Sequence, residues 1–276
     1  MKPNYIQYIY FLAILLSLPS CSVDDLDPEP ENQFVQVASA ASEKSFFDIR
    51  FYSEEPLFVG YNKVYFKLTD KSSGFALDQA AISLFPLMDM GTFKHACPVE
   101  NPDPVANTDG LFSGAVLFSM PGSNNSWSLS AKITANGKTD SVYFPISEIV
   151  ATSPVKKIVV IDSLSTGPGT WKITKHPVSL VEPPEWKVGN NTFEITVHTM
   201  ASMMSFPCCN DLTVEITPEM PSMGHGSPNN VNPVMTEMGH YVGTVNFTMT
   251  GAWRINMVFK ENGRIIGKNA FFDIVF

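Results

Sequence analysis

Two short segments of the chain decide its fold: residues 127–133 read WSLSAKI, and residues 253–259 read WRINMVF. In both segments apolar and polar residues alternate, which is typical of a β-strand that turns one face toward a core. Asn136-Gly137 and Asn262-Gly263 lie just beyond them, between strand-like runs. Asn-Gly pairs in such positions predict tight hairpin turns.

The two segments belong to a duplicated unit. Val59-Gly60-Tyr61-Asn62 returns as Val188-Gly189-Asn190-Asn191, and residues 111–118 return as residues 240–247, both at an offset of 129 residues. A nearly constant offset indicates duplication. Four more β-branched or aromatic runs complete the units, at residues 64–68, 81–85, 193–197 and 212–216. We therefore predict an all-β protein with two tandem immunoglobulin-like β-sandwiches, residues 44–152 and 153–276.

The composition restricts the classes of function. Only 16% of the 276 residues are charged, and the net charge of −9 argues against a nucleic-acid partner. Four cysteines are too few for a disulfide scaffold. The sequence has no nucleophile elbow, phosphate-binding loop or HExxH motif, so we expect a protein that is not an enzyme.

The N-terminus resembles an export signal. Lys2 precedes an apolar run, residues 9–18, that is too short to span a bilayer comfortably. Leu18-Pro19-Ser20-Cys21 resembles a bacterial lipobox, so residues 1–20 are predicted to be a lipoprotein signal peptide and Cys21 the lipid acceptor. The alternative is an ordinary signal peptide in which Cys21 is incidental.

An acidic stretch with prolines follows, and residues 21–43 are predicted to form a flexible tether. This stretch also resembles surface-export signals of some lipoproteins, and a plain spacer is the alternative. We expect the protein in the cell envelope, anchored by its N-terminal lipid to the outer membrane.

The second unit carries a loop rich in methionine and histidine. Its two ends both read Met-x-x-Met-x-His, and the six residues are Met220, Met223, His225, Met235, Met238 and His240. Thioether sulfur and imidazole suit Cu(I) and other soft ions. If the flanking strands pair, the two ends are expected to meet and form a copper site. The alternative is a loop that plugs one end of the sandwich, because methionine commonly fills cores.

Two further clusters contain soft donors. The first unit has a thinner version of the loop, with Met88, Met90, His95 and Cys97, beside which Lys94 would disfavour a cation. The second unit has an earlier loop with Met200, Met203, Met204, Cys208 and Cys209. For this loop reduced thiols, a weak soft-metal site and buried core all remain open.

Both units resemble the YtkA-like domain family, relatives of FixH-like envelope proteins. The resemblance spans most of residues 44–276. It is carried in the second unit by Pro218, Met220, Met223, Gly224, His225, Gly243, Phe247, Met249, Gly251 and Trp253. In the first unit the matching residues are Pro86, Met88, Met90, Gly91, His95, Gly114, Phe118, Met120, Pro121 and Trp127. The resemblance implies an immunoglobulin-like fold outside the cytoplasmic membrane and a link to copper or other heavy metals. In the first unit, Gly91 and His95 are four residues apart rather than adjacent, which weakens the case for an equivalent site.

Together these features predict a lipid-anchored envelope protein that binds Cu(I) or another soft metal through methionine and histidine. It would buffer the metal or pass it to an efflux or oxidase-assembly protein. The alternative is a non-catalytic structural or recognition lipoprotein whose sandwich loops face a protein or glycan partner.

Overall fold

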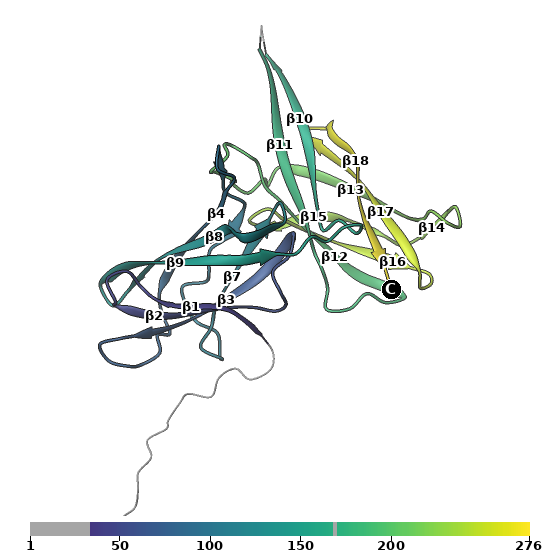
Figure 1. Ribbon diagram of the computed structural model, residues 1–276. Helices are drawn as coiled ribbons and strands as arrows, with labels where there is room; N and C mark the ends of the chain where they lie inside the picture. The colour runs from purple at the N-terminus through teal and green to yellow at the C-terminus, as the bar shows by residue number, and fades with distance from the viewer. Residues whose placement is uncertain (1–33, 168–169) are drawn as a thin grey trace, which may run out of the picture. The chain divides into compact units, whose positions relative to one another are not determined.

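The computed structural model describes residues 34–167 and 170–276, which contain strands and no helix (Figure 1). Among these residues, nothing forms a helix of the length and hydrophobicity that a membrane span requires. The predicted signal peptide, Cys21 and the first part of the predicted tether lie outside the described residues.

The first sandwich consists of two antiparallel sheets. The first sheet, in spatial order, is β1 (Val35–Ala41), β2 (Phe47–Ser53), β3 (Gly60–Asp70), β7 (Phe112–Phe118) and β6 (Val99–Glu100). The second sheet is β5 (Lys94–His95), β4 (Ala81–Asp89), β8 (Gly122–Ala135) and β9 (Lys138–Ile149). The ring centroids of Phe51 in the first sheet and Phe144 in the second are 5.6 Å apart, so the core fills the space between the two sheets.

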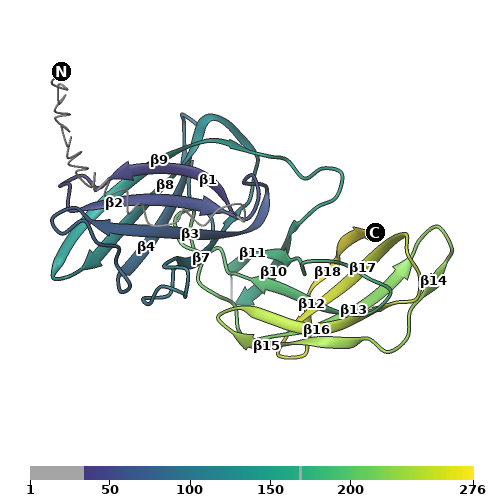
Figure 2. The ribbon, with the colours of Figure 1, turned by 90° about the horizontal axis from the view of Figure 1, so that it is seen from below.

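The second sandwich repeats this arrangement strand by strand (Figure 2). Its first sheet is β10 (Ile158–Gly167), β11 (Thr170–Val181), β12 (Gly189–Val197), β16 (His240–Phe247) and β15 (Val231–Glu237). Its second sheet is β14 (His225–Gly226), β13 (Leu212–Met220), β17 (Ala252–Glu261) and β18 (Arg264–Val275). The identical strand orders confirm the all-β prediction and show the duplication at the level of topology.

The segments that decide the fold behave as their patterns predict. In β17, Trp253, Ile255, Met257 and Phe259 are buried while the residues between them are partly exposed. The hairpin turns after β8 and β17 have positive φ at both central residues, 50° and 71° at Asn136-Gly137 and 49° and 78° at Asn262-Gly263. This is the geometry of the type I′ turn that the Asn-Gly pairs predict.

Three details differ from the sequence-based expectations. Strand β1 begins at Val35, so the first sandwich starts before residue 44 and takes in the end of the predicted tether. The hairpin of β10 and β11, which Figure 1 shows as a long projecting pair, is not among the predicted strands. Met120, Met249 and Met257 belong to strand-like runs of the sequence, where we expect core methionines; Met257 is buried, but Met120 and Met249 are 37% and 40% exposed because they follow β7 and β16 rather than lying within them.

Candidate metal centre

In the second sandwich, Met220 and His225 lie directly opposite each other on β13 and β14. A tight turn joins these strands, in which the backbone N–H groups of Met223 and Gly224 both donate to the carbonyl of Met220 at 3.0 Å. Directly opposed residues of an antiparallel pair point to the same face, with Cβ atoms about 5 Å apart. The thioether of Met220 and the imidazole of His225 are therefore neighbours.

The His225 ring stands edge-on to the indole of Trp253, with ring centroids 5.7 Å apart and planes at 81°. The Nδ1 atom of His225 lies 3.0 Å from the carbonyl oxygen of Gly226, to which its N–H donates. This bond fixes the tautomer and leaves the lone pair on Nε2. Metal-binding histidines are commonly held in this way, by donation of the other ring N–H to a carbonyl.

The first sandwich contains the same arrangement. Met88 is opposite His95 on β4 and β5, and the His95 ring stands edge-on to Trp127 at 5.3 Å and 88°. Nδ1 of His95 lies 2.9 Å from the carbonyl oxygen of Ala96. The wider spacing of Gly91 and His95 thus does not prevent an equivalent site, because the longer turn returns the chain to the same register.

The two sites differ in depth. His95 is only 6% exposed, and its Nε2 atom is buried without a hydrogen-bond partner among the described residues. His225 is half-buried. Met90 and Met223, the outer methionines of the two loops, are 41% and 62% exposed.

Cys97 and Lys94, the other two residues singled out in this loop, have different surroundings. Cys97 is 3% exposed and packs in the first hydrophobic core, where burial raises the pKa of its thiol. Lys94 forms an ion pair with Asp89 at 2.8 Å, so its charge is partly neutralised.

The second Met-x-x-Met-x-His triplet lies at the other end of the second sandwich. Strands β13 and β16 belong to different sheets, so the pairing that would bring the triplets together does not occur. Trp253 contacts His225, and its ring centroid is 5.2 Å from that of Phe247, the last residue of β16. His240 is the first residue of the same strand. Seven residues of strand span about 23 Å. Met235, Met238 and His240 therefore cannot share one metal with Met220 and His225.

His240 is held by two carboxylates instead. Its Nδ1–H donates to Glu194 at 2.6 Å, and its Nε2–H donates to Glu100 of the first sandwich at 2.8 Å. Tyr61 also donates to Glu100, at 2.7 Å. Burial opposes a charge on the ring, but the two carboxylates outweigh burial and raise the pKa of His240 to about 10. At neutral pH both nitrogens carry protons, so neither has a lone pair for a metal.

The earlier loop of the second sandwich separates its two adjacent cysteines. Cys209 packs against the second core, whereas Cys208 is opposite His198 in an isolated antiparallel bridge. Met203 and Met204 are 41% and 44% exposed. Within residues 34–167 and 170–276, no group of three or more His, Cys, Asp or Glu side chains is arranged to hold a metal ion.

The family comparison bears on the second sandwich. Residues 170–258 match the YtkA-like family model. The match runs from the start of β11 into β17 and includes Met220, His225 and Trp253, so it confirms the resemblance for this part of the chain. The first sandwich lies outside the matched residues, and it shares with the second the strand order and the Met–His–Trp arrangement. No curated protein matches the chain.

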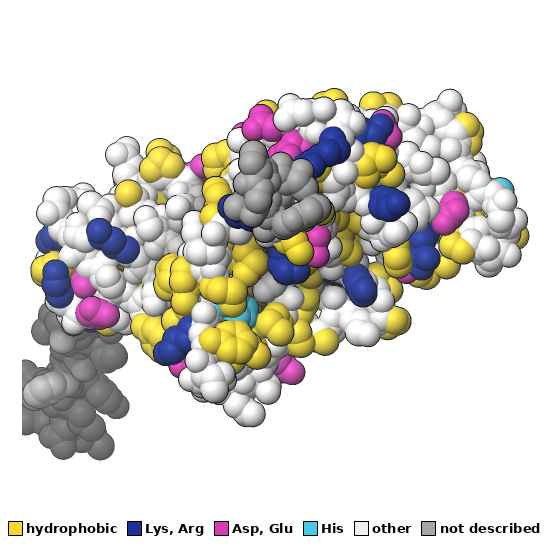
Figure 3. Space-filling model, turned by 90° about the horizontal axis from the view of Figure 1, so that it is seen from above, with side chains coloured by type: hydrophobic (Ala, Val, Ile, Leu, Met, Phe, Trp, Pro, Cys, Tyr) yellow, Lys and Arg dark blue, Asp and Glu magenta, His cyan; other side chains and the backbone are white. Residues whose placement is uncertain are grey.

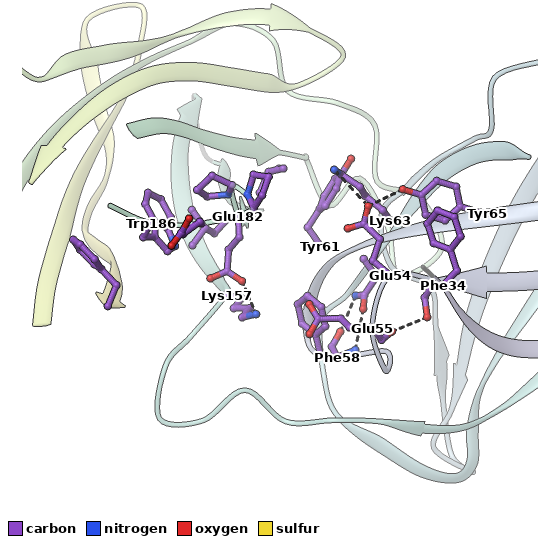
Figure 4. Close-up of a pocket in the computed structure, with 18 residues that line it drawn as sticks. Phe34, Glu54, Glu55, Phe58, Tyr61, Lys63, Tyr65, Lys157, Glu182 and Trp186 are labelled. Atoms are coloured by element: carbon purple, nitrogen blue, oxygen red, sulfur yellow. Dashed lines mark hydrogen bonds and ion pairs between the residues drawn. The ribbon is translucent and has the colours of Figure 1, made fainter. Parts of the chain in front are cut away.

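A separate groove of about 840 Å³ lies beside the YtkA-like domain. Figure 4 shows Trp186, Glu182 and Lys157 on one side of it and Tyr61, Phe58 and Glu54 on the other. Lys157 forms an ion pair with Glu182 at 2.5 Å, and its Nζ lies 4.2 Å from the centre of the Phe58 ring. Acidic and basic side chains are interspersed on the face drawn in Figure 3.

Several residues of these sites were not singled out from the sequence as site residues. Trp127 and Trp253 were assigned to strands and to the family resemblance but not to a site, although each lies beside the histidine of its repeat. No sequence pattern marked Glu100, Glu194 or His198 as a site residue, because their roles depend on contacts between segments that are distant in the chain.

Proposed function

We propose that the protein binds Cu(I), or another soft monovalent ion, at two Met–His–Trp sites. The sites consist of Met88, His95 and Trp127 in the first sandwich and Met220, His225 and Trp253 in the second. The proposal rests chiefly on one observation. In both repeats the histidine opposite the methionine donates its Nδ1–H to the carbonyl oxygen of the following residue, so the lone pair lies on Nε2.

The donor set fits a soft cation. Thioether sulfur and imidazole bind Cu(I) well and bind hard cations poorly. The indole ring beside each histidine adds an electron-rich face that attracts a cation. Thioether sulfur has no proton to lose, so the methionine donors would keep their affinity in a mildly acidic envelope.

The proposed setting is the cell envelope, with Cys21 as a lipid anchor to the outer membrane. There the protein would buffer copper or pass it to an efflux or oxidase-assembly protein. The lipobox-like sequence at residues 18–21 and the YtkA-like match support this setting.

The test is competition for Cu(I) with a colorimetric chelator under reducing conditions. The variants Met220→Leu/His225→Leu and Met88→Leu/His95→Leu are each expected to lose one bound equivalent, and the combined variant to lose both. Met257→Leu is the matched control, because Met257 is a buried core methionine outside both sites. Unchanged stoichiometry and affinity in the combined variant would refute the proposal.

A second candidate function is non-catalytic recognition of a protein or glycan partner. The groove favours it, because aromatic rings and carboxylates line a space large enough for a small ligand. Trp186 lines the groove and is partly exposed, whereas Trp127 and Trp253 are buried. A change in Trp186 fluorescence on titration with a ligand, lost in Trp186→Phe, would support recognition.

A further inference from the structure

His198 is a buried side chain whose polar atoms have no partner in the part of the chain that the structure describes. It follows β12, is 0% exposed, and neither Nδ1 nor Nε2 has a hydrogen-bond partner among the described residues. A neutral imidazole has one donor and one acceptor, and leaving each unsatisfied in a protein interior costs about 1–3 kcal/mol. Buried polar groups are nearly always paired, so an unpaired one points to a ligand.

Cys208 lies directly opposite His198 in an isolated antiparallel bridge. Two main-chain hydrogen bonds flank the pair of His198 and Cys208, from Thr199 N to Pro207 O at 2.8 Å and from Cys209 N to Val197 O at 2.9 Å. This pattern defines a non-hydrogen-bonded antiparallel pair, in which the Cα atoms approach to about 4.5 Å and the side chains point to the same face. The imidazole and the thiol are therefore adjacent.

The next residue, Cys209, points the other way. It packs against the second core, as the alternation of side chains along an extended segment requires. Cys208 is partly exposed. The bridge thus leaves one thiol beside His198 with access from solvent, and a second thiol directed toward the core.

Charges of both signs act on the pair. Burial lowers the pKa of His198 to about 4, so the ring is neutral at pH 7 and keeps a lone pair. The positive charge of His240 also acts on His198 and would oppose a cation there. Burial raises the pKa of the Cys208 thiol, and the negative charge of Glu100, which favours a cation, acts on both side chains. A bound cation would offset the charge of a Cys208 thiolate.

We propose that His198 and Cys208 form a two-coordinate site for a monovalent soft cation, Cu(I) or Ag(I). Two donors are too few for Zn(II), which takes four ligands in structural sites. Thiolate and imidazole are donors that suit Cu(I). On binding, the Cys208 S–H bond breaks, one sulfur–metal bond and one nitrogen–metal bond form, and one proton passes to solvent. This site stands independently of the two Met–His–Trp sites.

The experiment uses the full chain in detergent and one equivalent of Ag(I) with excess imidazole as a competing ligand. Two single variants each leave one thiol of the adjacent pair: Cys209→Ser keeps Cys208, and Cys208→Ser keeps Cys209. Alkylation of the remaining thiol by iodoacetamide is followed by mass spectrometry of its peptide. Ag(I) is expected to slow alkylation of Cys208 at least tenfold and that of Cys209 by less than twofold, and Zn(II) is expected to protect neither.

The contribution of the imidazole is read from the same assay. His198→Leu in the Cys209→Ser background is expected to remove most of the protection of Cys208 while its circular dichroism spectrum stays unchanged. His198→Gln serves the same purpose if the leucine variant does not fold. Equal protection of the two cysteines, full protection without His198, protection by Zn(II), or no proton release at pH 7 would overturn the proposal. The assay is repeated in the combined Met88→Leu/His95→Leu/Met220→Leu/His225→Leu background, in which the Met–His–Trp sites cannot take up the Ag(I), so a failure there leaves the proposed function untouched.

Discussion

Replacing His240 with glutamine removes the cation from the junction of two carboxylates. His240 donates to Glu194 within its own sheet and to Glu100 of the first sandwich. The side chains of His240, Glu100 and Glu194 are 14%, 15% and 29% exposed, so water screens them only in part. The variant leaves two carboxylates facing each other across a neutral amide, and we expect it to be less stable than the wild type.

The size of the effect follows from the pKa of His240. Its increase from 6.5 to about 10 corresponds to an upper limit of about 5 kcal/mol at 1.36 kcal/mol for each unit. Removing one partner of a buried ion pair typically costs about 3–5 kcal/mol. Because the carboxylates keep some contact with water, we expect a loss of about 3 kcal/mol in the free energy of unfolding at pH 7.

The pH dependence has a definite sign. The folded protein holds the His240 proton more tightly than the unfolded chain does, so the stabilisation is complete below pH 6.5 and is lost as the pH rises toward 10. The free-energy difference between wild type and His240→Gln should therefore be constant between pH 5.5 and 6.5 and shrink at higher pH.

Urea unfolding, followed by tryptophan fluorescence from pH 5.5 to 10, measures this difference. Lys175→Gln is the control, because Lys175 and Asp162 form an ion pair in which both side chains are more than half exposed. Exposed pairs of this kind contribute at most about 1 kcal/mol. A His240→Gln variant within about 0.5 kcal/mol of wild type at pH 7, or a difference that grows above pH 6.5, would refute the reasoning.

Three other predictions test separate parts of the protein. Cys21→Ser should move the protein from the membrane pellet to the soluble fraction and abolish labelling by a fatty-acid analogue; retention of the label would contradict lipidation at Cys21. Phe51→Ala should cost about 3–5 kcal/mol in urea unfolding, because Phe51 is fully buried, stacks on Phe66 at 5.1 Å and reaches the opposite sheet; a loss below about 1 kcal/mol would contradict this packing. His198→Leu should raise the free energy of unfolding of the metal-free protein by about 1–3 kcal/mol, since it removes two unpartnered buried nitrogens; a loss of stability would show that they are satisfied.

Local sequence patterns predicted the strands that carry clear alternation or a β-branched or aromatic run. The alternation at residues 127–133 and 253–259 matches the buried faces of β8 and β17, and the Asn-Gly pairs match the turns that follow. The sequence analysis did not predict the first two strands of either sandwich, which are β1 and β2 in the first and β10 and β11 in the second. They lie outside the segments that recur visibly in the two repeats, and one of them overlaps the polar stretch assigned to the tether.

The sequence identified the soft donors but not how they group. Met220 and His225 meet because a tight turn joins β13 to β14, which is a local feature. Met235 and His240 are separated from them because β15 and β16 pair within the other sheet. Which strands share a sheet depends on contacts between residues far apart in sequence, so the identical Met-x-x-Met-x-His spacing could not reveal that the two triplets lie at opposite ends.

The number of methionines is weaker evidence for metal binding than the buried ring nitrogens of two histidines are. Methionine fills cores readily, and an edge-on contact between imidazole and indole is a stable packing arrangement in its own right. Neither accounts for Nε2 of His95, which is buried and has no partner within residues 34–167 and 170–276, although a leucine there would pack at no polar cost. Among the described residues, the metal-free fold therefore carries a free-energy cost that its own contacts do not offset. This cost comes from Nε2 of His95 and from both ring nitrogens of His198. A cation that accepts a nitrogen lone pair would offset it at both histidines, and in each case a sulfur donor lies opposite, Met88 beside His95 and Cys208 beside His198.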